Sequence, residues 1–131
     1  MNERGNRLVA IIDDDESVSR SLANLLASLN YRVKTFASAE AFLLSARRVD
    51  TACLVLDLRM AGMGGIDLLK SQAVDGLEVP TIVLTGDESD EARDECLRSG
   101  AIAFLRKPCN AAVLCATVKA AMRRSTYVST V

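Results

Sequence analysis

Short apolar runs alternate with longer amphipathic stretches along nearly the whole chain, and this alternation limits the folds that the sequence can adopt. The runs lie at residues 8–12, 32–36, 52–56, 81–84 and 102–105. Each run is too short for a buried helix, whereas the stretches between them place apolar residues at helical spacing. Strands that alternate with helices build parallel sheets with both faces covered. The sequence therefore predicts an α/β protein, a (βα)₅ chain with a doubly wound five-stranded parallel sheet.

The composition of each run indicates where its strand lies and where the helices end. Residues 52–56 are continuously apolar, as expected for a central strand, and residues 32–36 are mixed, which predicts an outer strand. Ser38 is a candidate cap for the second helix, whose apolar residues are Ala41, Phe42, Leu44 and Ala46. Asn110 is expected to cap a final helix that ends near Met122.

The length of 131 residues suits one compact domain. We expect this domain to cover residues 1–124 and to be followed by a polar tail at 125–131, either disordered or part of a linker. Sixteen basic and seventeen acidic residues give a net charge of −1, which leaves no broad positive field to bind nucleic acid. The sequence has no uninterrupted apolar span of about 18 residues. A cytoplasmic protein that does not enter a membrane is therefore predicted.

Cysteine and histidine usage narrows the possible chemistry. Cys53, Cys96, Cys109 and Cys115 lack CxxC spacing and are interpreted as reduced, mostly buried small hydrophobic residues. The chain contains no histidine. Hydrolases with an imidazole base and proteins phosphorylated on histidine are therefore excluded, because both need that side chain.

Five polar residues follow the predicted strands, at the edge of the sheet where ligands bind in open α/β folds. They are Asp13 and Asp14 after the first strand, Asp57 after the third, Thr85 after the fourth and Lys107 after the fifth. Three converging carboxylates repel one another unless a hard divalent cation with oxygen ligands neutralises them. The pattern predicts a Mg²⁺ site, at which Mn²⁺ or Ca²⁺ can substitute.

The same five residues suit phosphoryl transfer. Mg²⁺ usually leaves coordination positions open for phosphate oxygens, so that a neighbouring carboxylate can act as the nucleophile. Charge on the transferred group can be stabilised by a metal, a lysine and a hydroxyl. We therefore predict Asp57 as the nucleophile, with Lys107 and Thr85 binding the phosphoryl oxygens.

Four motifs resemble those of response-regulator receiver domains, which adopt the CheY-like, flavodoxin-like fold. The motifs are IIDDDE at 11–16, LVLDLRM at 54–60, IVLTG at 82–86 and FLRKP at 104–108. They look most like the FixJ-type subgroup, whose members usually carry a C-terminal helix-turn-helix DNA-binding domain. The resemblance implies a two-component response regulator domain that receives a phosphoryl group from a sensor histidine kinase and controls transcription through a domain that these 131 residues do not contain.

The resemblance also implies a role for individual residues. Asp14 would bind the metal directly, Asp13 through water, and Arg59 through its backbone carbonyl. Thr85 and Phe104 would form the conformational switch. Phosphorylation would then remodel the face made by the fourth helix, the last strand and the fifth helix, and this face would support homodimerisation.

Some positions carry alternative interpretations. Asp15 fits a helix cap better than a metal ligand. Arg59 and Asp87, each two residues beyond a site residue, are candidates for an ion pair that gates water access. The family commonly has a proline where Ala61 stands and often an acidic residue where Gly64 stands, so the loop after Asp57 is expected to be less stiff.

Other functions remain as rival hypotheses. A phosphatase with an aspartyl-phosphate intermediate typically needs a second Asp where Arg59 stands, so turnover as an enzyme is not expected beyond self-phosphorylation and autodephosphorylation. An unphosphorylated scaffold would have no need of Asp57, Thr85 and Lys107. A flavin-binding module would need a glycine- and hydroxyl-rich phosphate loop after the first strand.

Overall fold

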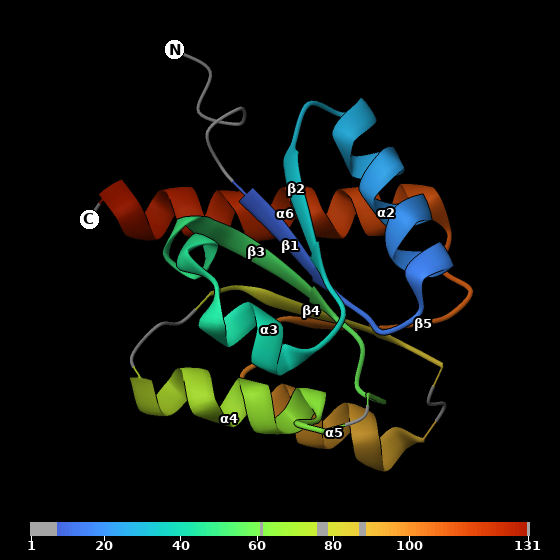
Figure 1. The fold of residues 1–131 in the computed structure, drawn as a ribbon, viewed down its shortest axis with the longest axis vertical. Helices are drawn as coiled ribbons and strands as arrows, with labels where there is room; N and C mark the ends of the chain where they lie inside the picture. Colours follow the sequence, from blue (N-terminus) through green and yellow to red (C-terminus); the bar gives the residue numbers. More distant parts are fainter. Residues whose placement is uncertain (1–7, 61, 76–78, 87–88, 131) are drawn as a thin grey trace.

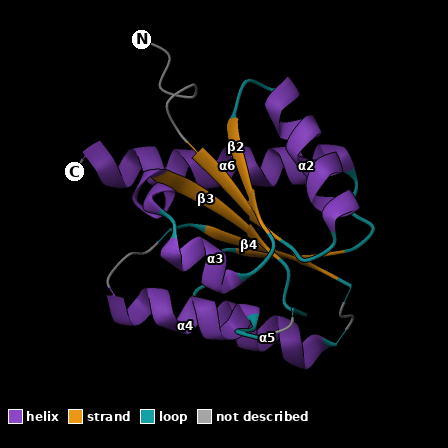
Figure 2. Cartoon of the chain, in the orientation of Figure 1, coloured by secondary structure: helices purple, strands orange, loops and turns teal. Residues whose placement is uncertain are grey.

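The computed structural model describes residues 8–60, 62–75, 79–86 and 89–130. Strands and helices alternate along this part of the chain, as Figures 1 and 2 show. The strands are β1 (Leu8–Ile12), β2 (Arg32–Phe36), β3 (Thr51–Leu56), β4 (Thr81–Thr85) and β5 (Ala103–Arg106). The helices are α2 (Glu16–Ser28), α3 (Ala39–Leu44), the 3₁₀ helix η1 (Ala46–Asp50), α4 (Gly65–Asp75), α5 (Asp90–Arg98) and α6 (Ala111–Thr130).

The five strands form one parallel sheet with the order β2-β1-β3-β4-β5. The predicted fold class is confirmed, and β2 is an outer strand as its mixed composition predicted. All six residues of β3 are buried, as expected for the central strand. The strand order reverses between β1 and β3, which makes the carboxyl ends of these two strands the switch point where open α/β sheets bind ligands.

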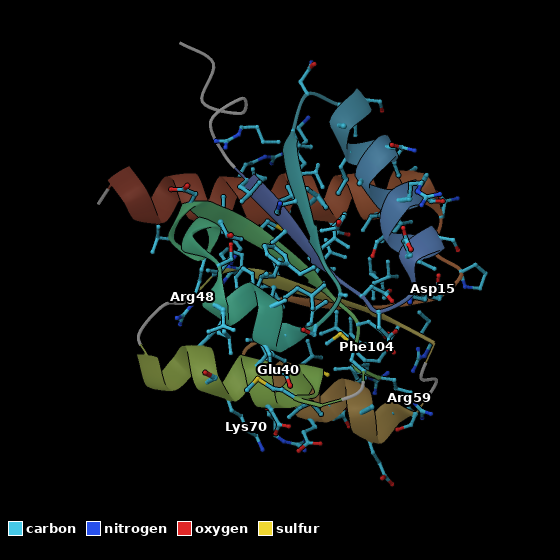
Figure 3. The ribbon with its side chains drawn as sticks, viewed as in Figure 1. Asp15, Glu40, Arg48, Arg59, Lys70 and Phe104 are labelled. Carbon is cyan, nitrogen blue, oxygen red and sulfur yellow. The ribbon has the colours of Figure 1, made fainter. Side chains whose placement is uncertain are left out.

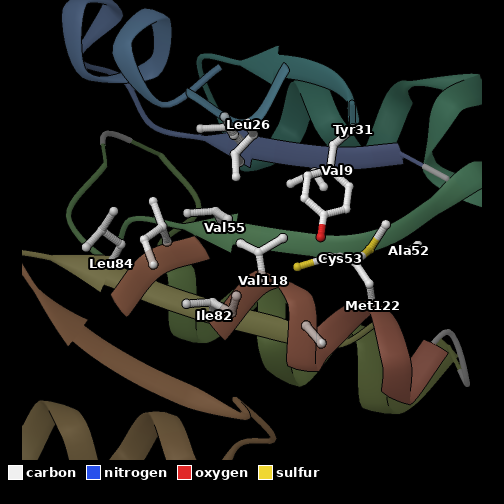
Figure 4. Packing of buried hydrophobic residues seen from close by; sticks show 13 residues of the cluster. Val9, Leu26, Tyr31, Ala52, Cys53, Val55, Ile82, Leu84, Val118 and Met122 are labelled. Carbon is white, nitrogen blue, oxygen red and sulfur yellow. The ribbon is translucent and has the colours of Figure 1, made fainter. Parts of the chain in front are cut away.

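Alternate residues of the strands point to two separate hydrophobic layers. Val9, Ile11, Val55 and Ile82 pack with Leu26 of α2 and with α6, in the layer shown in Figure 4. Ala10, Ile12, Leu54, Leu56 and Val83 point to the opposite layer and pack with α3, α4 and α5. Figure 1 shows α2 and α6 on one side of the sheet and α4 and α5 on the other. Both faces of the sheet are therefore covered.

Two helix ends differ from the sequence prediction. The second helix was expected to include Leu44 and Ala46 in its apolar face, but α3 ends at Leu44, which is 88% exposed, and Ala46 belongs to η1. Six residues make less than two helical turns, so Phe42 is the large side chain that anchors the helix in the core.

The last helix was expected to end near Met122, but α6 continues to Thr130. Residues 111–130 contain neither glycine nor proline, so nothing in this segment stops a helix once it has formed. The polar composition after Met122 was interpreted as a tail, although polar residues are also ordinary on the solvent side of a helix. No helix in the described ranges is both long enough and apolar enough to cross a membrane.

Candidate phosphoryl-transfer site

The two buried carboxylates of the site are placed by the backbone ladder of the sheet. The N–H of Asp13 donates to the carbonyl of Phe36 at 3.1 Å, and the N–H of Asp57 donates to the carbonyl of Ile12 at 3.0 Å. The parallel pairing thus continues one residue beyond β1 and β3. It sets Asp13 and Asp57 side by side at the switch point, and both are buried.

Asp14 completes a cluster of three carboxylates. One oxygen each from Asp13, Asp14 and Asp57 lies within 4.8 Å of the others, and Asp14 is exposed while its two partners are buried. Oxygen donors of this kind and spacing suit a hard divalent cation. The three aspartates predicted as metal ligands are therefore brought together.

Lys107 follows the carboxyl end of β5, and its side chain contacts this cluster. Its Nζ donates to Oδ2 of Asp13 at 2.7 Å and lies 3.9 Å from Oδ2 of Asp57. The N–H of Lys107 donates to the carbonyl of Thr85 at 2.9 Å, and the Lys107–Pro108 peptide bond is cis. One ammonium among three carboxylates leaves the cluster with a negative charge.

The surroundings of Asp57 act on its pKa in opposite directions. Burial raises the pKa of the Asp57 carboxyl above its ordinary value, and this is the largest effect. The ammonium of Lys107, the hydroxyl of Thr85 and the N–H of Arg59 oppose it by favouring the carboxylate, while Asp13 raises the pKa further. Thr85 is fully buried and donates its hydroxyl to Asp57. The carboxyl is thus surrounded by the groups that a phosphoryl group would need.

Asp15 is the N-cap of α2, as predicted. Its Oδ1 accepts from the N–H of Ser17 at 3.0 Å and from the N–H of Val18 at 3.3 Å. The hydrogen bond from the N–H of Val18 has the largest effect on the pKa of the Asp15 carboxyl and lowers it. The hydrogen bond from the hydroxyl of Ser17 lowers this pKa further. The third aspartate of the DDD run therefore starts the helix that follows the carboxylates of Asp13 and Asp14.

Thr85 and Phe104, the predicted switch pair, lie on neighbouring strands. Phe104 pairs with Val83, and both pack in the layer covered by α3, α4 and α5, the side to which Thr85 also points. The guanidinium carbon of Arg106 lies 5.5 Å from the centre of the Phe104 ring, and the same guanidinium contacts Asp90 at 3.2 Å. The half-buried ring is thus held between the core and the start of α5.

The proposed gating pair is only partly described. Arg59 is exposed at the start of the loop after β3, where Figure 3 labels it, and its N–H faces the Asp57 carboxyl. Asp87 lies outside the described residues.

The interpretation of Cys53 and Cys96 as buried is confirmed, while Cys109 and Cys115 are half-buried, and all four are free.

Two features of the site were not found by sequence reasoning. A Cβ at Gly65 would lie 3.0 Å from the carbonyl oxygen of Asp57, so that only glycine lets α4 begin so close to the backbone of Asp57. Glu40 of α3 accepts a hydrogen bond from the N–H of Met63, in the same loop, at 3.0 Å. These two residues are 23 positions apart, and a local pattern carries no signal for such a contact.

A groove of about 490 Å³ opens beside Lys107, between α2 and the start of α6. Its lining is mainly apolar and includes Val18, Leu22, Leu25 and Pro108, with Ser21 among its polar residues. Because Lys107 belongs both to this groove and to the carboxylate cluster, the groove leads directly to the site.

Comparisons with known proteins agree with this geometry. A family model described as the response regulator receiver domain matches residues 9–119. The transcriptional regulatory protein FixJ of Azorhizobium caulinodans is 40% identical over 117 residues, which cover 89% of this chain and 56% of the relative. The response regulator protein TmoT of Ectopseudomonas mendocina is 33% identical over 123 residues, which cover 94% of this chain and 56% of the relative.

Solved structures give the same result. The crystal structure of FixJ-N superposes with a TM-score of 0.82 at 37% identity, covering 89% of this chain and 94% of that one. The structure of the response regulator StyR gives a TM-score of 0.88 at 32% identity, covering 95% of this chain and 63% of that one. The chain thus spans about half the length of the curated relatives that it matches.

Proposed function

The chain belongs to the family of response regulator receiver domains, the phosphoryl-accepting modules of two-component signalling, and from this premise we propose that Asp57 is the phosphoacceptor. The observation that carries the proposal is the convergence of Asp13, Asp14 and Asp57 within 4.8 Å, with Nζ of Lys107 3.9 Å from Asp57. A nucleophilic carboxylate surrounded by a metal site, an ammonium and a hydroxyl is what phosphoryl transfer to aspartate requires.

In the proposed reaction, a carboxylate oxygen of Asp57 forms a bond to phosphorus as the bond between phosphorus and the histidine nitrogen of the donor breaks. Lys107 lies close enough to Asp57 to move from Asp13 to the phosphoryl oxygens and to neutralise part of their charge. The hydroxyl of Thr85, which donates to the carboxyl in the unphosphorylated protein, can donate to a phosphoryl oxygen instead.

We propose that Mg²⁺ is held by Asp14 and Asp57, by Asp13 through water, and by the backbone carbonyl of Arg59. The residues present fit this ion, because the cluster offers only oxygen donors and retains negative charge beside a single contacting ammonium. When bound, the ion neutralises charge on the phosphoryl oxygens. Mn²⁺ or Ca²⁺ can occupy the same oxygen cluster.

We propose a sensor histidine kinase as the phosphoryl donor in the cytoplasm, and the groove between α2 and α6 as its docking site. The groove is apolar and ends at Lys107, so a helix docked in it can bring a phosphohistidine to Asp57. The protein then acts as a switch rather than as an enzyme with turnover. Arg59 and Asp87 are kept as the proposed gate that sets the lifetime of the phosphorylated state.

We further propose that the output is transcription, since FixJ is named a transcriptional regulatory protein and this chain spans about half of it. The signal would pass through Thr85 and Phe104 to the face formed by α5, β5 and α6, named here the α5–β5–α6 face. A phosphorylation-dependent homodimer through this face would bring two attached output domains together.

Intact-mass measurement after incubation with acetyl phosphate and Mg²⁺ tests the proposed acceptor. We expect wild type to gain about 80 Da, the mass of one phosphoryl group, and Asp57→Asn to gain nothing. The control is Asp67→Asn, which changes an exposed aspartate on the first turn of α4. A gain of the same size in Asp57→Asn would refute the assignment, and so would the absence of any gain in wild type.

A further inference from the structure

The loop that joins Asp57 to α4 is fixed at both ends, and its middle contacts α3. At the ends, the N–H of Gly65 donates to the carbonyl of Leu58 at 3.4 Å, and Gly65 packs against the backbone of Asp57. In the middle, the N–H of Met63 donates to Oε2 of Glu40 at 3.0 Å. Figure 3 shows Glu40 on the side of α3 that faces α4. The position of the loop thus depends on a side chain from a helix that carries no other residue of the site.

The backbone of the loop is shaped to allow this contact. Gly62 has φ of +79°, a conformation that L side chains rarely adopt, and a Cβ at this position would overlap Oε2 of Glu40. The carboxylate of Glu40 accepts from its own N–H as well as from that of Met63, and these two hydrogen bonds lower its pKa. Glu40 is therefore ionised at neutral pH and makes a charge-assisted hydrogen bond to the loop.

We propose that Glu40 is a positioning residue that fixes the loop after the phosphoacceptor through the backbone of Met63 and thereby sets the rate of phosphoryl transfer. The loop begins at Leu58 and Arg59, and the N–H of Arg59 donates to Asp57. A shift of the loop changes this hydrogen bond and the position of the Arg59 carbonyl, the proposed metal ligand. Small displacements of positioning groups cost large factors in rate.

The hydrogen bond from Met63 to Glu40 and the close approach of Gly62 together restrict the loop by a tertiary contact. The kinetic part of the inference rests on the proposed function, whereas the contact itself does not.

The first test measures the contact in the unphosphorylated, metal-free protein, by amide hydrogen exchange at Met63. We expect Glu40→Ala to speed exchange about fivefold, the order expected for loss of one hydrogen bond, and Glu40→Gln to retain most of the protection because its amide oxygen can still accept. Gly62→Ala should match Glu40→Ala, since the new Cβ displaces the carboxylate. The control, Glu91→Ala, removes the same charge from the first turn of α5, where Glu91 makes no hydrogen bond or ion pair within the described residues.

The second test measures the initial rate of labelling by acetyl phosphate and Mg²⁺ in the same variants. We expect a several-fold lower rate in Glu40→Ala and Gly62→Ala, rescue in Glu40→Gln, and a wild-type rate in Glu91→Ala. Unchanged exchange at Met63 in Glu40→Ala would overturn the contact, and faster exchange with an unchanged labelling rate would overturn the positioning role. A wild type that is never labelled would overturn the proposed function and the kinetic part of this inference, and the exchange data would still distinguish that failure from loss of the contact.

Discussion

Asp57 illustrates a conflict that a single residue must resolve. Its burial disfavours the carboxylate, and the neighbouring Asp13 adds to this effect, yet the residue must be ionised to act as the proposed nucleophile. Lys107, Thr85 and the N–H of Arg59 supply the opposing interactions. Burial thus makes the carboxylate energetically unfavourable at the position where the proposed cation and phosphoryl group would be bound.

This conflict predicts that Asp57→Asn changes the thermal stability in metal-free buffer by an amount that depends on pH. Because the pKa of Asp57 is raised in the folded state, the folded protein binds more protons than the unfolded one between the ordinary and the raised pKa. The contribution of this group to stability is therefore present below its ordinary pKa and is lost as the pH rises through the raised pKa. We expect the variant to melt a few degrees above wild type at neutral pH, with a difference that shrinks as the pH falls.

Thermal melts with a chelator, from about pH 4.5 to 8, measure this difference. The contact of Lys107 with Asp13 does not involve Asp57, so we expect the ammonium to stay paired in the variant. A difference in melting temperature that is the same at every pH would contradict the argument.

A second prediction at this scale concerns Asp14. Binding of Mg²⁺ to the folded state stabilises it by mass action, so millimolar Mg²⁺ is expected to raise the melting temperature of wild type. Asp14→Ala should reduce this increase strongly while changing the metal-free melting temperature little, because Asp14 is exposed. The matched control is Asp15→Asn, which removes the adjacent charge and keeps a helix cap. Equal increases in wild type and Asp14→Ala would remove Asp14 from the metal site.

At the scale of elements, α2 and α6 form the wall on one side of the site. Asp15 begins α2 immediately after the carboxylate pair, and Lys107 lies just before α6. The groove between these helices therefore borders the site at Lys107, and its mainly apolar lining suits a helix of another protein better than a small polar molecule.

The proposed docking groove predicts that Ser21→Arg slows phosphoryl transfer from the kinase but not from acetyl phosphate. Ser21 is exposed and lines the groove, so a long charged side chain there should obstruct docking without disturbing the core. With a sensor kinase that phosphorylates wild type, we expect transfer to slow by about tenfold, as a loss of roughly 1.4 kcal/mol in docking would produce. Labelling by acetyl phosphate should be unchanged.

Ser28→Arg is the matched control for this prediction, because Ser28 is exposed at the far end of the same helix and does not line the groove. Equal rates of kinase-dependent transfer in Ser21→Arg and wild type would place the docking site elsewhere. A parallel loss of acetyl phosphate labelling would instead indicate damage to the site.

At the scale of the whole molecule, the core layer covered by α3, α4 and α5 connects the site to the surface at the start of α5. Thr85 and Phe104 lie on adjacent strands, and Arg106 links the ring of Phe104 to Asp90 at the start of α5. If Thr85 moves towards a phosphoryl group, Phe104 can occupy the vacated space, and the packing of α5 against β5 changes with it. The phosphoryl group shifts the population only by its difference in affinity for the two packings.

This link predicts that activation changes the oligomeric state. With the phosphoryl mimic beryllofluoride and Mg²⁺, we expect light scattering to show a dimer for wild type and a monomer for Thr85→Ala. Leu97 of α5 and Val113 of α6 are exposed apolar side chains, and we expect such a contact to bury them. If neither the mass nor the amide protection of the described residues between 89 and 106 changes on activation, the proposed switch is wrong.

The sequence alone was sufficient to predict the order of strands and helices along the chain and the residues that stand at the strand ends. Both follow from local periodicity, because an apolar run of four or five residues in a βα repeat places the residues that follow it at the edge of a parallel sheet. Asp13, Asp57, Thr85 and Lys107 could therefore be identified without any distance. The N-cap role of Asp15 was also predictable, since capping is a local interaction.

Only the tertiary structure decided the contacts between segments that are distant in the chain. The hydrogen bond from Met63 to Glu40, the approach of Gly65 to Asp57 and the groove beside Lys107 depend on how α3, α4 and α6 pack on the sheet. The exposure of Leu44 was missed for a related reason. The extension of α6 to Thr130 was missed although residues 111–130 contain no glycine or proline to end the helix. The polarity of a residue indicates whether it favours the core or the solvent, whereas its neighbours in space determine whether it is in fact buried.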